Sequence, residues 1–522
     1  MTLRFLPVGP RTLLVELPDL DRTLALFDAL NADPIEGVLE IVPAAQTLMV
    51  RTRVGVAADG ALAAAILSRA PPPGTAPTLN TAEVVDLPVT YDGEDLAEVA
   101  TLMGLSVPEV IAAHQAATWQ VAFCGFAPGF AYMTCDDPRF DIARRSSPRT
   151  RIPAGSVALA GRFSGVYPLE SPGGWQLIGR TPVPMFDLTR SPPALLAPGQ
   201  RVRFVEKAAQ PPAPAPHPAP ATRGLRVVST AFPITVQDEG RPGQGGQGVS
   251  GAGALDIGAL RRANRRVGNP SGAAALEITF GPTRLSVDEP VTLALDGAAT
   301  AAEIEADGTR IAVDPTRPFA LDAGEVLILP PPTRGMRSYL AVRGGFDAPL
   351  ALRSASRDTL AGIGPEPLGN GSVLPLAHAP AAATDPTPAP GAPLPAVGEV
   401  VEIPVTLGPR TDWFPPDQVE AFLSQEWTVS PLSSRVGMRL EGQALTRDAR
   451  ELPSEGTETG AIQIPHSGQP VFFLADHPLT GGYPVIATVL PQALDLAAQI
   501  PPGARIRFIA AAPFAPLKPD TP

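Results

Sequence analysis

Lysine is nearly missing from this chain of 522 residues. Only Lys207 and Lys518 occur among its 40 basic residues, so the other 38 are arginines. A Gly-x-x-x-x-Gly-Lys-Ser/Thr phosphate loop is excluded because no lysine is available for it. A catalytic lysine that forms a Schiff base is equally disfavoured. No lysine lies between methionines as it does in biotin-carrying domains, so we expect no covalent biotin on this chain.

Cysteine and long apolar runs are also scarce, and positive charge is in deficit. Cys124 and Cys135 give no disulfide framework and no zinc-ligand pattern, so we expect ordinary thiols and no metal centre. No run of about 18 apolar residues predicts a membrane span, and the first residues lack the apolar core of a signal peptide. The net charge of −12 disfavours a nucleic-acid surface. We therefore expect a cytoplasmic protein that binds neither membranes nor nucleic acids.

The length predicts three or four domains, and two proline-rich segments separate some of them. Residues 207–224 and 379–396 are expected to be extended, semi-rigid linkers. Residues 1–88 show the order β-α-β-β-α-β of a ferredoxin-like domain, with its last strand at 83–87. The rest is mainly β, with short strands and glycine–proline turns. The predicted domains are 1–88, 89–206, 225–378 and 397–511.

Two helices have clear start signals. Ser106 and Glu109 match a capping box, which predicts a helix that runs to about 117. Asp256 is a candidate N-cap for a second helix, which is expected to stop at Gly268 and Pro270.

Two segments of the chain share three landmarks in the same order. The landmarks are an Ile-Pro turn (152–157 and 464–471), a Gly-Gly-aromatic strand (173–178 and 481–486) and a Pro-Gly strand (198–204 and 502–508). Repeats of this size indicate duplicated domains. Residues 150–205 and 462–509 are therefore predicted to share a fold.

Glycine and arginine are densest at 149–184. Glycine permits tight turns and close backbone approach, and the arginine fork suits carboxylate or phosphate. Arg151 precedes the Ile-Pro turn and Arg180 follows the Gly-Gly-Trp strand. We expect the turn and the strand to approach one another, which would place both arginines at one pocket mouth. The alternative is a turn-rich barrel whose arginines are merely solvated.

Three further motifs leave alternatives open. Residues 243–248 satisfy Gly-x-Gly-x-x-Gly, but no continuous βαβ unit surrounds them, which favours a glycine-rich substrate loop over a dinucleotide site. Asp238 could orient Arg241 or act as a base, and the alternative is a plain turn. His114, near the end of its helix, is either a packed or capping histidine or a general base.

Several motifs carry a family resemblance. In the first half they are FCGFAPGFAY at 123–132, IPAGSV at 152–157 and SPGGW at 171–175, which closely resemble the B component of 5-oxoprolinase. That family includes the kinase inhibitor KipI and allophanate hydrolase subunit 1. The second half resembles the C component of 5-oxoprolinase, the family of KipA, allophanate hydrolase subunit 2 and the urea carboxylase transferase region. Its motifs are TVQDEGRPG at 235–243, LEIT at 276–279, VRGGF at 342–346, RVGMRLEG at 435–442 and TGGYP at 480–484.

The resemblance implies a fusion of B-type and C-type halves and a mainly β protein with α+β content. A ferredoxin-like N-terminal domain would precede three cyclophilin-like β-barrels. The implied reaction is ATP-dependent opening of 5-oxoproline to glutamate with a separate partner protein, the A component of 5-oxoprolinase, with ATP as co-substrate and Mg²⁺ implied. A higher oligomer of the B–C pair stays open. The alternatives are the carboxyltransferase component of a biotin-dependent urea or amide carboxylase, which would need a separate carrier protein, and a KipI-like kinase inhibitor.

Candidate site residues follow from the same motifs. Catalytic roles are expected for His114, Arg151, Arg180 and Asp238. Expected substrate contacts in the first half are Gly125, Pro128, Gly129, Phe130, Arg149, Gly155, Ser156, Tyr167, Ser171, Gly173, Gly174 and Trp175. In the second half they are Gln237, Arg241, Gly243, Glu277, Arg343, Arg435, Arg439, Thr480, Gly481, Gly482 and Tyr483. The family pattern is broken by Ser434, where asparagine is usual, and by His477-Pro478-Leu479 in place of a more polar segment.

Overall fold

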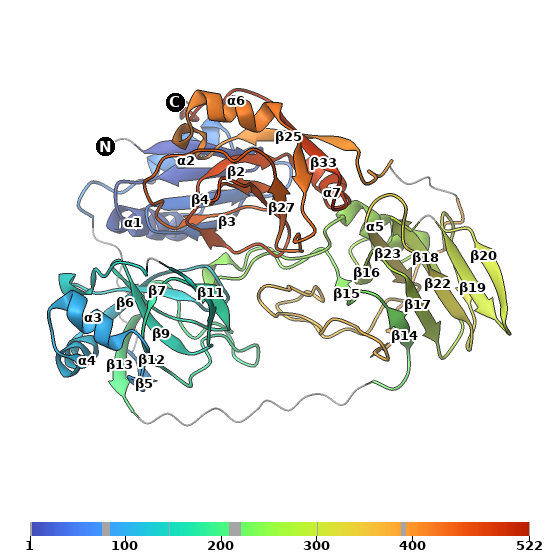
Figure 1. Ribbon diagram of the computed structural model, residues 1–522, viewed down its shortest axis with the longest axis horizontal. Coiled ribbons are helices and arrows are strands. Elements are labelled where there is room, and N and C mark those ends of the chain that lie inside the picture. Colours follow the sequence, from blue (N-terminus) through green and yellow to red (C-terminus); the bar gives the residue numbers. More distant parts are fainter. Residues whose placement is uncertain are drawn as a thin grey trace.

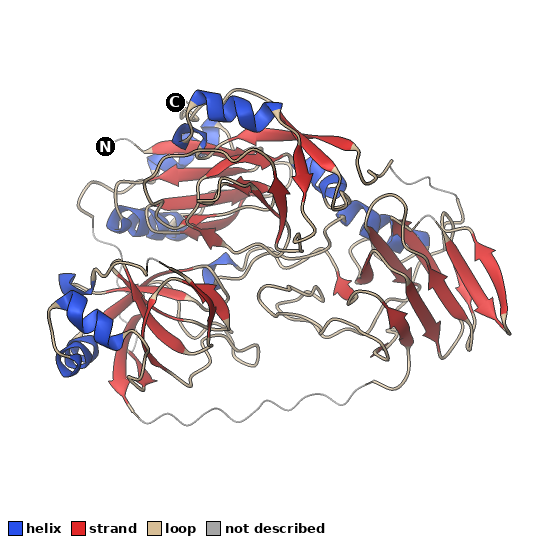
Figure 2. Cartoon of the chain, in the orientation of Figure 1, coloured by secondary structure: helices blue, strands red, loops and turns tan. Residues whose placement is uncertain are grey.

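A computed structural model describes residues 3–75, 84–145, 147–207, 221–299, 301–387 and 393–520. Figure 1 shows four β-rich parts. The N-terminal domain (blue) lies beside the last barrel (orange to red), the first barrel (cyan to green) lies below them, and the middle sheets (yellow-green) lie to the right. Strands dominate and helices are few (Figure 2). The predicted mainly β class with barrel sheets is confirmed.

The N-terminal domain is a four-stranded antiparallel sheet with two helices. Its elements are β1 (Arg4–Gly9), β2 (Thr12–Glu16), α1 (Leu20–Ala32), β3 (Val38–Pro43), β4 (Thr47–Thr52) and α2 (Gly60–Ser68). The strand order is β1-β2-β4-β3. Asp19 and Asp59 cap the two helices, because each side chain accepts hydrogen bonds from N–H groups of the first turn.

The prediction that 83–87 forms the last strand of this domain was wrong. The strand observed there, β5 (Val85–Val89), belongs to the first barrel, and β1 lies beside β2 where the fourth strand of a ferredoxin-like sheet is expected. The sequence pattern did not reveal β1 because Pro7 interrupts its apolar run. Proline is tolerated there because β1 is an edge strand, whose outward N–H position needs no partner.

The first barrel is one seven-stranded sheet, in the order β12-β9-β10-β7-β6-β13-β5. Its further elements are α3 (Leu96–Met103), α4 (Val107–Ala116), β6 (Trp119–Cys124), β7 (Ala131–Thr134), η1 (Pro138–Phe140), β8 (Arg149–Ile152), β9 (Ser156–Ala160), β10 (Phe163–Val166), β11 (Ser171–Gly173), β12 (Gln176–Arg180) and β13 (Arg201–Glu206). A bridge between Thr90 and Arg180 joins the two ends of the sheet. The capping box of Ser106 and Glu109 is confirmed at the start of α4.

The middle sheets have six and five strands and face each other across one apolar core. Their elements are β14 (Leu225–Thr230), β15 (Thr235–Gln237), η2 (Gly245–Gln247), α5 (Ile257–Arg266), β16 (Ala275–Thr279), β17 (Thr283–Val287), β18 (Val291–Gly297), β19 (Ala302–Ala306), β20 (Thr309–Val313), β21 (Phe319–Leu321), β22 (Val326–Leu329), β23 (Arg337–Val342) and β24 (Val373–Leu374). The predicted cap is confirmed, since Asp256 accepts from Ala259 N–H at the start of α5. Leu260 of α5 packs against Ala294 and Tyr339, so the helix covers the five-stranded sheet.

The last barrel is closed, in the order β25-β32-β29-β30-β27-β26-β33. Its elements are β25 (Val400–Leu407), η3 (Thr411–Trp413), α6 (Pro416–Ser424), β26 (Trp427–Val429), β27 (Gly437–Glu441), β28 (Glu455–Gly456), β29 (Ala461–Gln463), β30 (Val471–Phe473), β31 (Thr480–Gly481), β32 (Val485–Val489), η4 (Pro491–Ala493), α7 (Leu494–Ala497) and β33 (Arg505–Ala510). Matched in chain order, its strands follow the same circuit as those of the first barrel. Both barrels also contain one parallel pair, β5 with β13 and β25 with β33. The predicted duplication of 150–205 and 462–509 is therefore confirmed.

One of the three sequence landmarks does not occupy equivalent places. The Gly-Gly-aromatic landmark leads into β12 in the first barrel and into β32 in the last. The Pro-Gly landmark leads into β13 and β33, so both landmarks lie at equivalent strands. The Ile-Pro turn at 152–157 leads into β9, whereas the turn at 464–471 follows β29 and leads into β30. That pairing was wrong by one strand, because an Ile-Pro turn suits the end of any short strand.

The second proline-rich segment is bound to the middle sheets along part of its length. Ala382 N–H donates to Gly268 O, Asp385 N–H donates to Arg266 O, and Gly335 N–H donates to Pro395 O, each at 2.8 Å. An extended chain presents its backbone groups to neighbouring loops, so a proline-rich composition does not by itself make a free spacer. Most of the first linker (208–220) and residues 388–392 of the second lie outside the described residues.

The N-terminal domain packs directly on the last barrel. Leu6, Leu14 and Met49 form one buried cluster with Leu479, a residue of the segment that departs from the family pattern. The apolar side chain of Leu479 therefore fits its position against the N-terminal sheet. Arg410 of the last barrel lies at the same seam and pairs with Glu16 of β2 and Glu455 of β28.

Candidate functional site

The turn at 153–156 lies against the end of β12. Thr181 N–H donates to Gly155 O at 2.8 Å, and Gly155 N–H donates to Tyr167 O at 2.7 Å. Gly155 has a φ of +81°, and a Cβ there would lie 2.3 Å from Thr181 O, so only glycine fits. The predicted approach of this turn to the strand after Gly173-Gly174-Trp175 is confirmed.

The arginines of this region have different environments. Arg149 donates to both carboxylate oxygens of buried Asp95, at 2.8 and 2.9 Å, so it holds β8 to the start of α3. The side chain of Arg151 is 75% exposed and pairs with Glu170 at 2.7 Å. The side chain of Arg180 is 69% exposed and pairs with Asp92, also at 2.7 Å. That both grip one ligand stays a prediction.

An aromatic cluster covers the outer face of the first barrel. In β9, Val157 and Leu159 point into the barrel core, whereas Ala158 and Ala160 point to this cluster. Leu20 of α1 packs on it, which links the N-terminal domain to the barrel. The rings, whose neighbouring centroids lie 4.5 to 6.5 Å apart, belong to Phe123, Phe126, Phe130, Tyr132, Phe163, Tyr167 and Trp175.

The loop at 125–130 meets the second half of the chain directly. Phe126 N–H donates to Thr480 Oγ1 at 2.9 Å, and a Cβ on Gly125 would lie 2.5 Å from that oxygen. Gly129 N–H donates to Gln247 O at 2.9 Å. Phe126 has a φ of +64°, a conformation that costs energy for a residue other than glycine and often marks a functional loop. We call this meeting of loops 125–130, 243–248 and 480–483 the junction.

Ser156 and Ser171 are satisfied locally. The Ser156 hydroxyl donates to Pro153 O at 2.8 Å, and the Ser171 hydroxyl donates to Leu169 O at 3.4 Å. Both contacts stay within one turn of the first barrel, so the structure places these hydroxyls in the turns themselves and not at the junction.

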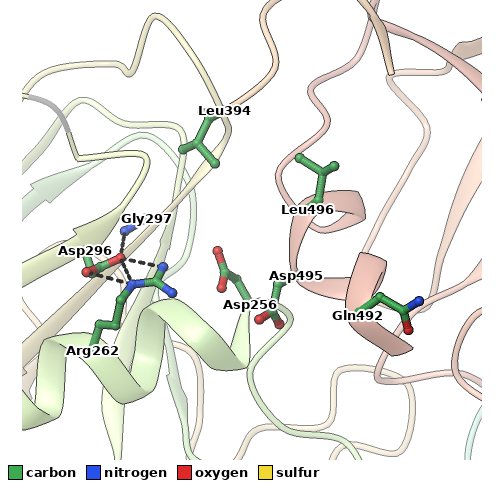
Figure 3. A pocket seen from close by; sticks show the side chains of 8 residues that line it. All are labelled: Asp256, Arg262, Asp296, Gly297, Leu394, Gln492, Asp495 and Leu496. Carbon is green, nitrogen blue, oxygen red and sulfur yellow. Dashed lines mark hydrogen bonds and ion pairs between the residues drawn. The ribbon is translucent and has the colours of Figure 1, made fainter. Parts of the chain in front are cut away.

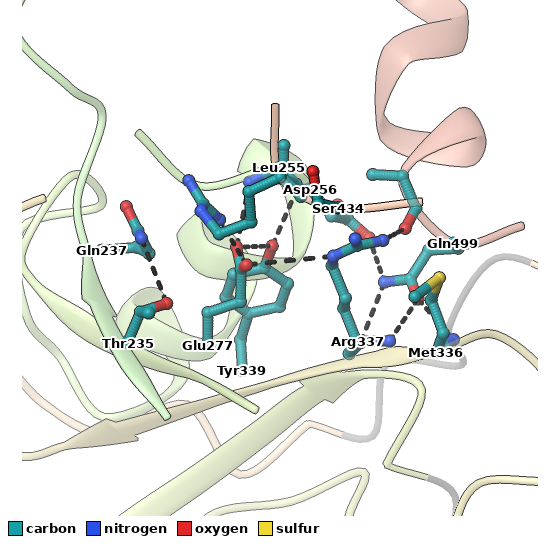
Figure 4. Close-up of polar contacts among 12 residues, drawn as sticks. Thr235, Gln237, Leu255, Asp256, Glu277, Met336, Arg337, Tyr339, Ser434 and Gln499 are labelled. Atoms are coloured by element: carbon teal, nitrogen blue, oxygen red, sulfur yellow. Dashed lines mark hydrogen bonds and ion pairs between the residues drawn. The ribbon is translucent and has the colours of Figure 1, made fainter. Parts of the chain in front are cut away.

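Glu277 and Arg435, both predicted site residues, form a buried ion pair between the middle sheets and the last barrel. Arg435 also donates to both oxygens of Asp476, at 3.0 Å each. The Tyr339 hydroxyl donates to Glu277 at 2.7 Å, beside the Arg337 and Gln499 contacts drawn in Figure 4. Burial alone would raise the pKa of Glu277, but the charge of Arg435 holds this pKa below its usual range. Buried charges persist when they are paired in this way, so the network locks the two parts together.

Asp238 and Arg241 both hold the loop at 351–357. Asp238 accepts from the hydroxyls of Ser354 and Ser356, at 2.6 Å each, and Arg241 donates to Ser356 O. These contacts favour the plain-turn alternative for Asp238. Within the described residues, Arg241 Nη1 and Gln237 Oε1 are buried without a hydrogen-bond partner, so both are available to a water or a ligand.

His114 lies in the core of the first barrel and has no exposed surface. Its ring stacks on Phe204 with centroids 4.4 Å apart, and its Nδ1 lies 2.8 Å from the Tyr91 hydroxyl. Burial lowers the pKa of His114 to about 3. These contacts favour the packed histidine over the general base.

The remaining predicted arginines and Tyr483 lie away from the junction's hydrogen bonds. Arg343 donates to Val267 O at 2.9 Å and so fixes the end of α5. Arg439 is exposed on β27. Tyr483 is 39% exposed, and its ring meets His466 edge-on at 5.6 Å.

The sequence motifs did not point to the carboxylates Asp358 and Asp476. Asp358 accepts from the Ser250 hydroxyl at 2.9 Å, and Asp476 accepts from Thr359 N–H at 2.8 Å. Burial, together with the charge of Asp476, raises the pKa of Asp358. Neither residue lies in a recognisable motif, and only the fold brings them together. Asp476 directly precedes His477, where the sequence departs from the family pattern, and this departure is the one feature of the sequence that could have pointed to it.

A cavity of about 200 Å³ lies between α5 and α7 (Figure 3). Asp256 and Asp495 face it beside the ion pair of Arg262 with Asp296. Burial, with a further contribution from Asp495, raises the pKa of Asp256 to about 6. Asp495 accepts from Ile257 N–H at 3.0 Å, and Asp256 is the N-cap of α5. Both carboxylates therefore already accept hydrogen bonds from the first turn of this helix.

No group of three or more histidine, cysteine, aspartate or glutamate side chains suited to a metal ion occurs within the described ranges. In those ranges no single helix is long and apolar enough to cross a membrane. The bent pair α3 and α4 passes that test only when both helices are taken together.

Two family models match most of the chain. The model described as "Carboxyltransferase domain, subdomain A and B" matches residues 247–510, and that of "subdomain C and D" matches residues 3–196. The crystal structure of TTHA0988 superposes with a TM-score of 0.81 and 34% identity, covering 96% of this chain and 99% of that one.

Curated relatives match the two halves separately. The second half is 38% identical to the C component of 5-oxoprolinase from Escherichia coli K12 over 289 residues, 55% of this chain and 90% of that protein. A stretch of 125 residues, 23% of this chain, is 49% identical to the B component of 5-oxoprolinase from Bacillus subtilis and covers about half (52%) of that protein. Urea amidolyase of Lachancea kluyveri is 32% identical over 315 residues, 55% of this chain and 17% of that protein. The chain therefore belongs to the carboxyltransferase-domain family, as a single-chain fusion of a B-type and a C-type 5-oxoprolinase component.

Proposed function

We propose that this chain is the B–C component of an ATP-dependent 5-oxoprolinase that acts in the cytoplasm. It opens 5-oxoproline to L-glutamate together with a separate A component. The observation that carries the proposal is the junction, where Phe126 of the B-type half donates to Thr480 of the C-type half. Motifs of both halves then contribute to one site.

The chemistry asks for groups that bind anions. An unactivated lactam needs coupling to ATP, so its amide oxygen would accept the γ-phosphoryl group with release of ADP. Water then attacks the activated carbon and the ring C–N bond breaks, which leaves an acyl phosphate on the side chain of glutamate. A second water hydrolyses this acyl phosphate to glutamate and inorganic phosphate. Arginine forks stabilise carboxylate and phosphoryl oxygens through charged hydrogen bonds. Arg151 and Arg180 are exposed enough to serve such a substrate.

The nucleotide would have to be held without a lysine phosphate loop. Lys207 and Lys518 are the two lysines of the chain, and neither lies in a glycine-rich loop. Magnesium is commonly bound through one or two carboxylates and the phosphates themselves. The lack of a three-ligand cluster in the described residues is compatible with a metal that arrives with ATP.

Carboxyl transfer from carboxybiotin to urea or a similar amide is the second candidate. Its support is the similarity to urea amidolyase, which covers 55% of this chain. This function requires a separate biotin-carrying protein. A KipI-like kinase inhibitor is disfavoured because the two halves are fused here.

One coupled assay separates these functions. The full chain is incubated with a candidate A component, ATP and either 5-oxoproline or urea. A second series contains a biotinylated carrier protein in place of the A component. We expect glutamate from 5-oxoproline only when both proteins and ATP are present. Urea-dependent turnover with the carrier, or glutamate formation without the A component, would overturn the proposal.

A further inference from the structure

The glycine-rich loop at 243–248 is held from the N-terminal domain. Gly245 N–H donates to Glu40 Oε1 at 2.6 Å. A Cβ on Gly245 would lie 2.7 Å from that oxygen and 3.0 Å from Val42 Cγ2. A side chain at position 245 would therefore crowd the Glu40 carboxylate and the Val42 side chain of β3.

The other oxygen of Glu40 leads to the last barrel. Glu40 Oε2 pairs with Arg51 Nη1 at 3.2 Å, and Arg51 Nε pairs with Glu458 Oε2 at 2.9 Å. Thr12 Oγ1 donates to the same Glu458 oxygen at 2.9 Å. The side chains of Glu40, Arg51 and Glu458 are only 7%, 15% and 18% exposed, so water screens these charges weakly.

The opposite side of the glycine-rich loop contacts the first barrel. Gln247 O accepts from Gly129 N–H, and Gln247 Oε1 accepts from Ala194 N–H at 3.2 Å. Gly248 has a φ of +76°, and a Cβ there would lie 2.6 Å from Ala127 O. The glycine-rich loop therefore lies between β3 and the loop at 125–130 and forms hydrogen bonds to both.

We infer that Glu40 is a positioning residue, whose two carboxylate oxygens tie the glycine-rich loop to the last barrel and so set the geometry of the junction. No substrate contact was expected from residues 1–88, yet this domain connects the glycine-rich loop to Glu458 of the last barrel. The kinetic part of this inference rests on the proposed 5-oxoprolinase function. The structural part does not.

Hydrogen exchange on the full chain tests the structural part. Glu40→Gln removes the charge that holds Arg51 and weakens the bond to Gly245 N–H. We expect exchange in the segment 244–249 to accelerate at least about tenfold, because its protection depends on local opening, while α5 is unchanged. The matched control is Glu36→Gln, an exposed glutamate four residues earlier. Unchanged exchange at 244–249 in Glu40→Gln overturns the inference.

A second variant keeps the test informative if Glu40→Gln folds poorly. Glu458→Gln breaks only the far end of the link and leaves the Glu40–Gly245 bond intact. It should accelerate exchange at 244–249 less than Glu40→Gln, by about twofold to threefold, as expected for a partial loss of local protection. If exchange at 244–249 in Glu458→Gln equals that of the wild type, the last barrel does not help to hold the glycine-rich loop, and this part of the inference is overturned.

The kinetic part is read in the coupled assay with the A component. A displaced junction should raise KM for 5-oxoproline about fivefold to tenfold with kcat changed less than twofold, the pattern of weakened binding. Glu36→Gln should match wild type. Faster exchange with unchanged KM would show that the loop's position does not matter for turnover. Absence of turnover in the wild type would instead count against the proposed function and leave the exchange result standing.

Discussion

In the first barrel the indole N–H of Trp119 donates to the carbonyl of His114, five residues earlier, at 3.3 Å. In the last barrel Trp427 donates to the carbonyl of Phe422, also five residues earlier, at 3.0 Å. Phe422 stacks on Phe508 of β33 with centroids 4.8 Å apart, as His114 stacks on Phe204 of β13. His114 therefore fills the place of a core phenylalanine.

The outer faces of the two barrels differ far more than their interiors. The first carries the aromatic cluster around Trp175, whereas the last carries a small apolar cluster that includes Phe473. Charged side chains such as Arg410 and Arg435 then join the last barrel to its neighbours. The comparison teaches that the shared interior secures the fold, while each outer face is specialised for what packs on it.

The largest effect is expected from breaking the ion-pair network of Arg435 between the middle sheets and the last barrel. Arg435→Ala leaves Glu277 and Asp476 buried without their shared cation, which typically costs about 3–5 kcal/mol. Chemical denaturation should show this loss in the free energy of unfolding. Arg439→Ala, an exposed arginine nearby on β27, is the control and should change stability by less than about 0.5 kcal/mol. Equal losses in the two variants would contradict the network.

Exchanging the two core rings sharpens the comparison. Phe422→His buries polar ring nitrogens without partners and should cost about 2–4 kcal/mol. The reverse change, His114→Phe, removes a buried ring nitrogen that has no partner in the described structure, although the Tyr91 hydroxyl loses its contact. We expect that cost to stay below about 1.5 kcal/mol, the range for volume-conserving core exchanges. A larger loss in His114→Phe than in Phe422→His would break the equivalence.

Arg151 and Arg180 test whether the first barrel's exposed rim binds substrate. Arg151→Lys or Arg180→Lys keeps the charge but loses the paired bonds. We expect an unchanged melting temperature and a loss of about 1.5–3 kcal/mol of ligand interaction, which is roughly a tenfold to hundredfold lower kcat/KM. Wild-type kinetics in both variants would show that these arginines serve only their surface ion pairs.

The smallest effect is a difference in pH dependence. The pKa of His114 in the folded protein, about 3, lies below its unfolded value of about 6.5. As the pH falls, this histidine is protonated in the unfolded chain at a higher pH than in the folded protein. Its contribution to the free energy of unfolding is therefore fully present above about pH 6.5 and is lost as the pH falls below that value. Between pH 7 and 5.5 the wild type should lose about 1 kcal/mol more than His114→Phe. Parallel stability curves for the two proteins over this range would show that the histidine is not buried as described.

Local signals in the sequence predicted local structure well. The capping box at Ser106 and the N-cap at Asp256 start the helices expected of them. The repeated landmarks predicted two barrels of one design. Prediction failed where composition misleads, because Pro7 concealed an edge strand and the proline content of 379–396 suggested a free spacer where the chain is partly bound.

The candidate site could be predicted only in part. The motifs supplied Thr480, Glu277 and Arg435, and the fold brings the last two together. Asp358, Asp476 and Glu40 were missed because their contacts with Ser250, Thr359 and Gly245 join residues more than 100 positions apart in the chain. Pairings over such separations depend on topology, which no local pattern encodes. The roles of the residues in substrate binding stay predictions.

The packing of the N-terminal domain on the last barrel has a consequence for synthesis. Phe5 forms a bridge with Leu517, and Asp520 N–H donates to Gly60 O at 3.0 Å. Domains leave the ribosome in order and begin to fold as they emerge. The sheet that carries Leu6 and Met49 therefore keeps its apolar face uncovered until the last barrel, β25 to β33, has been made. During that interval the nascent chain should be a client of chaperones.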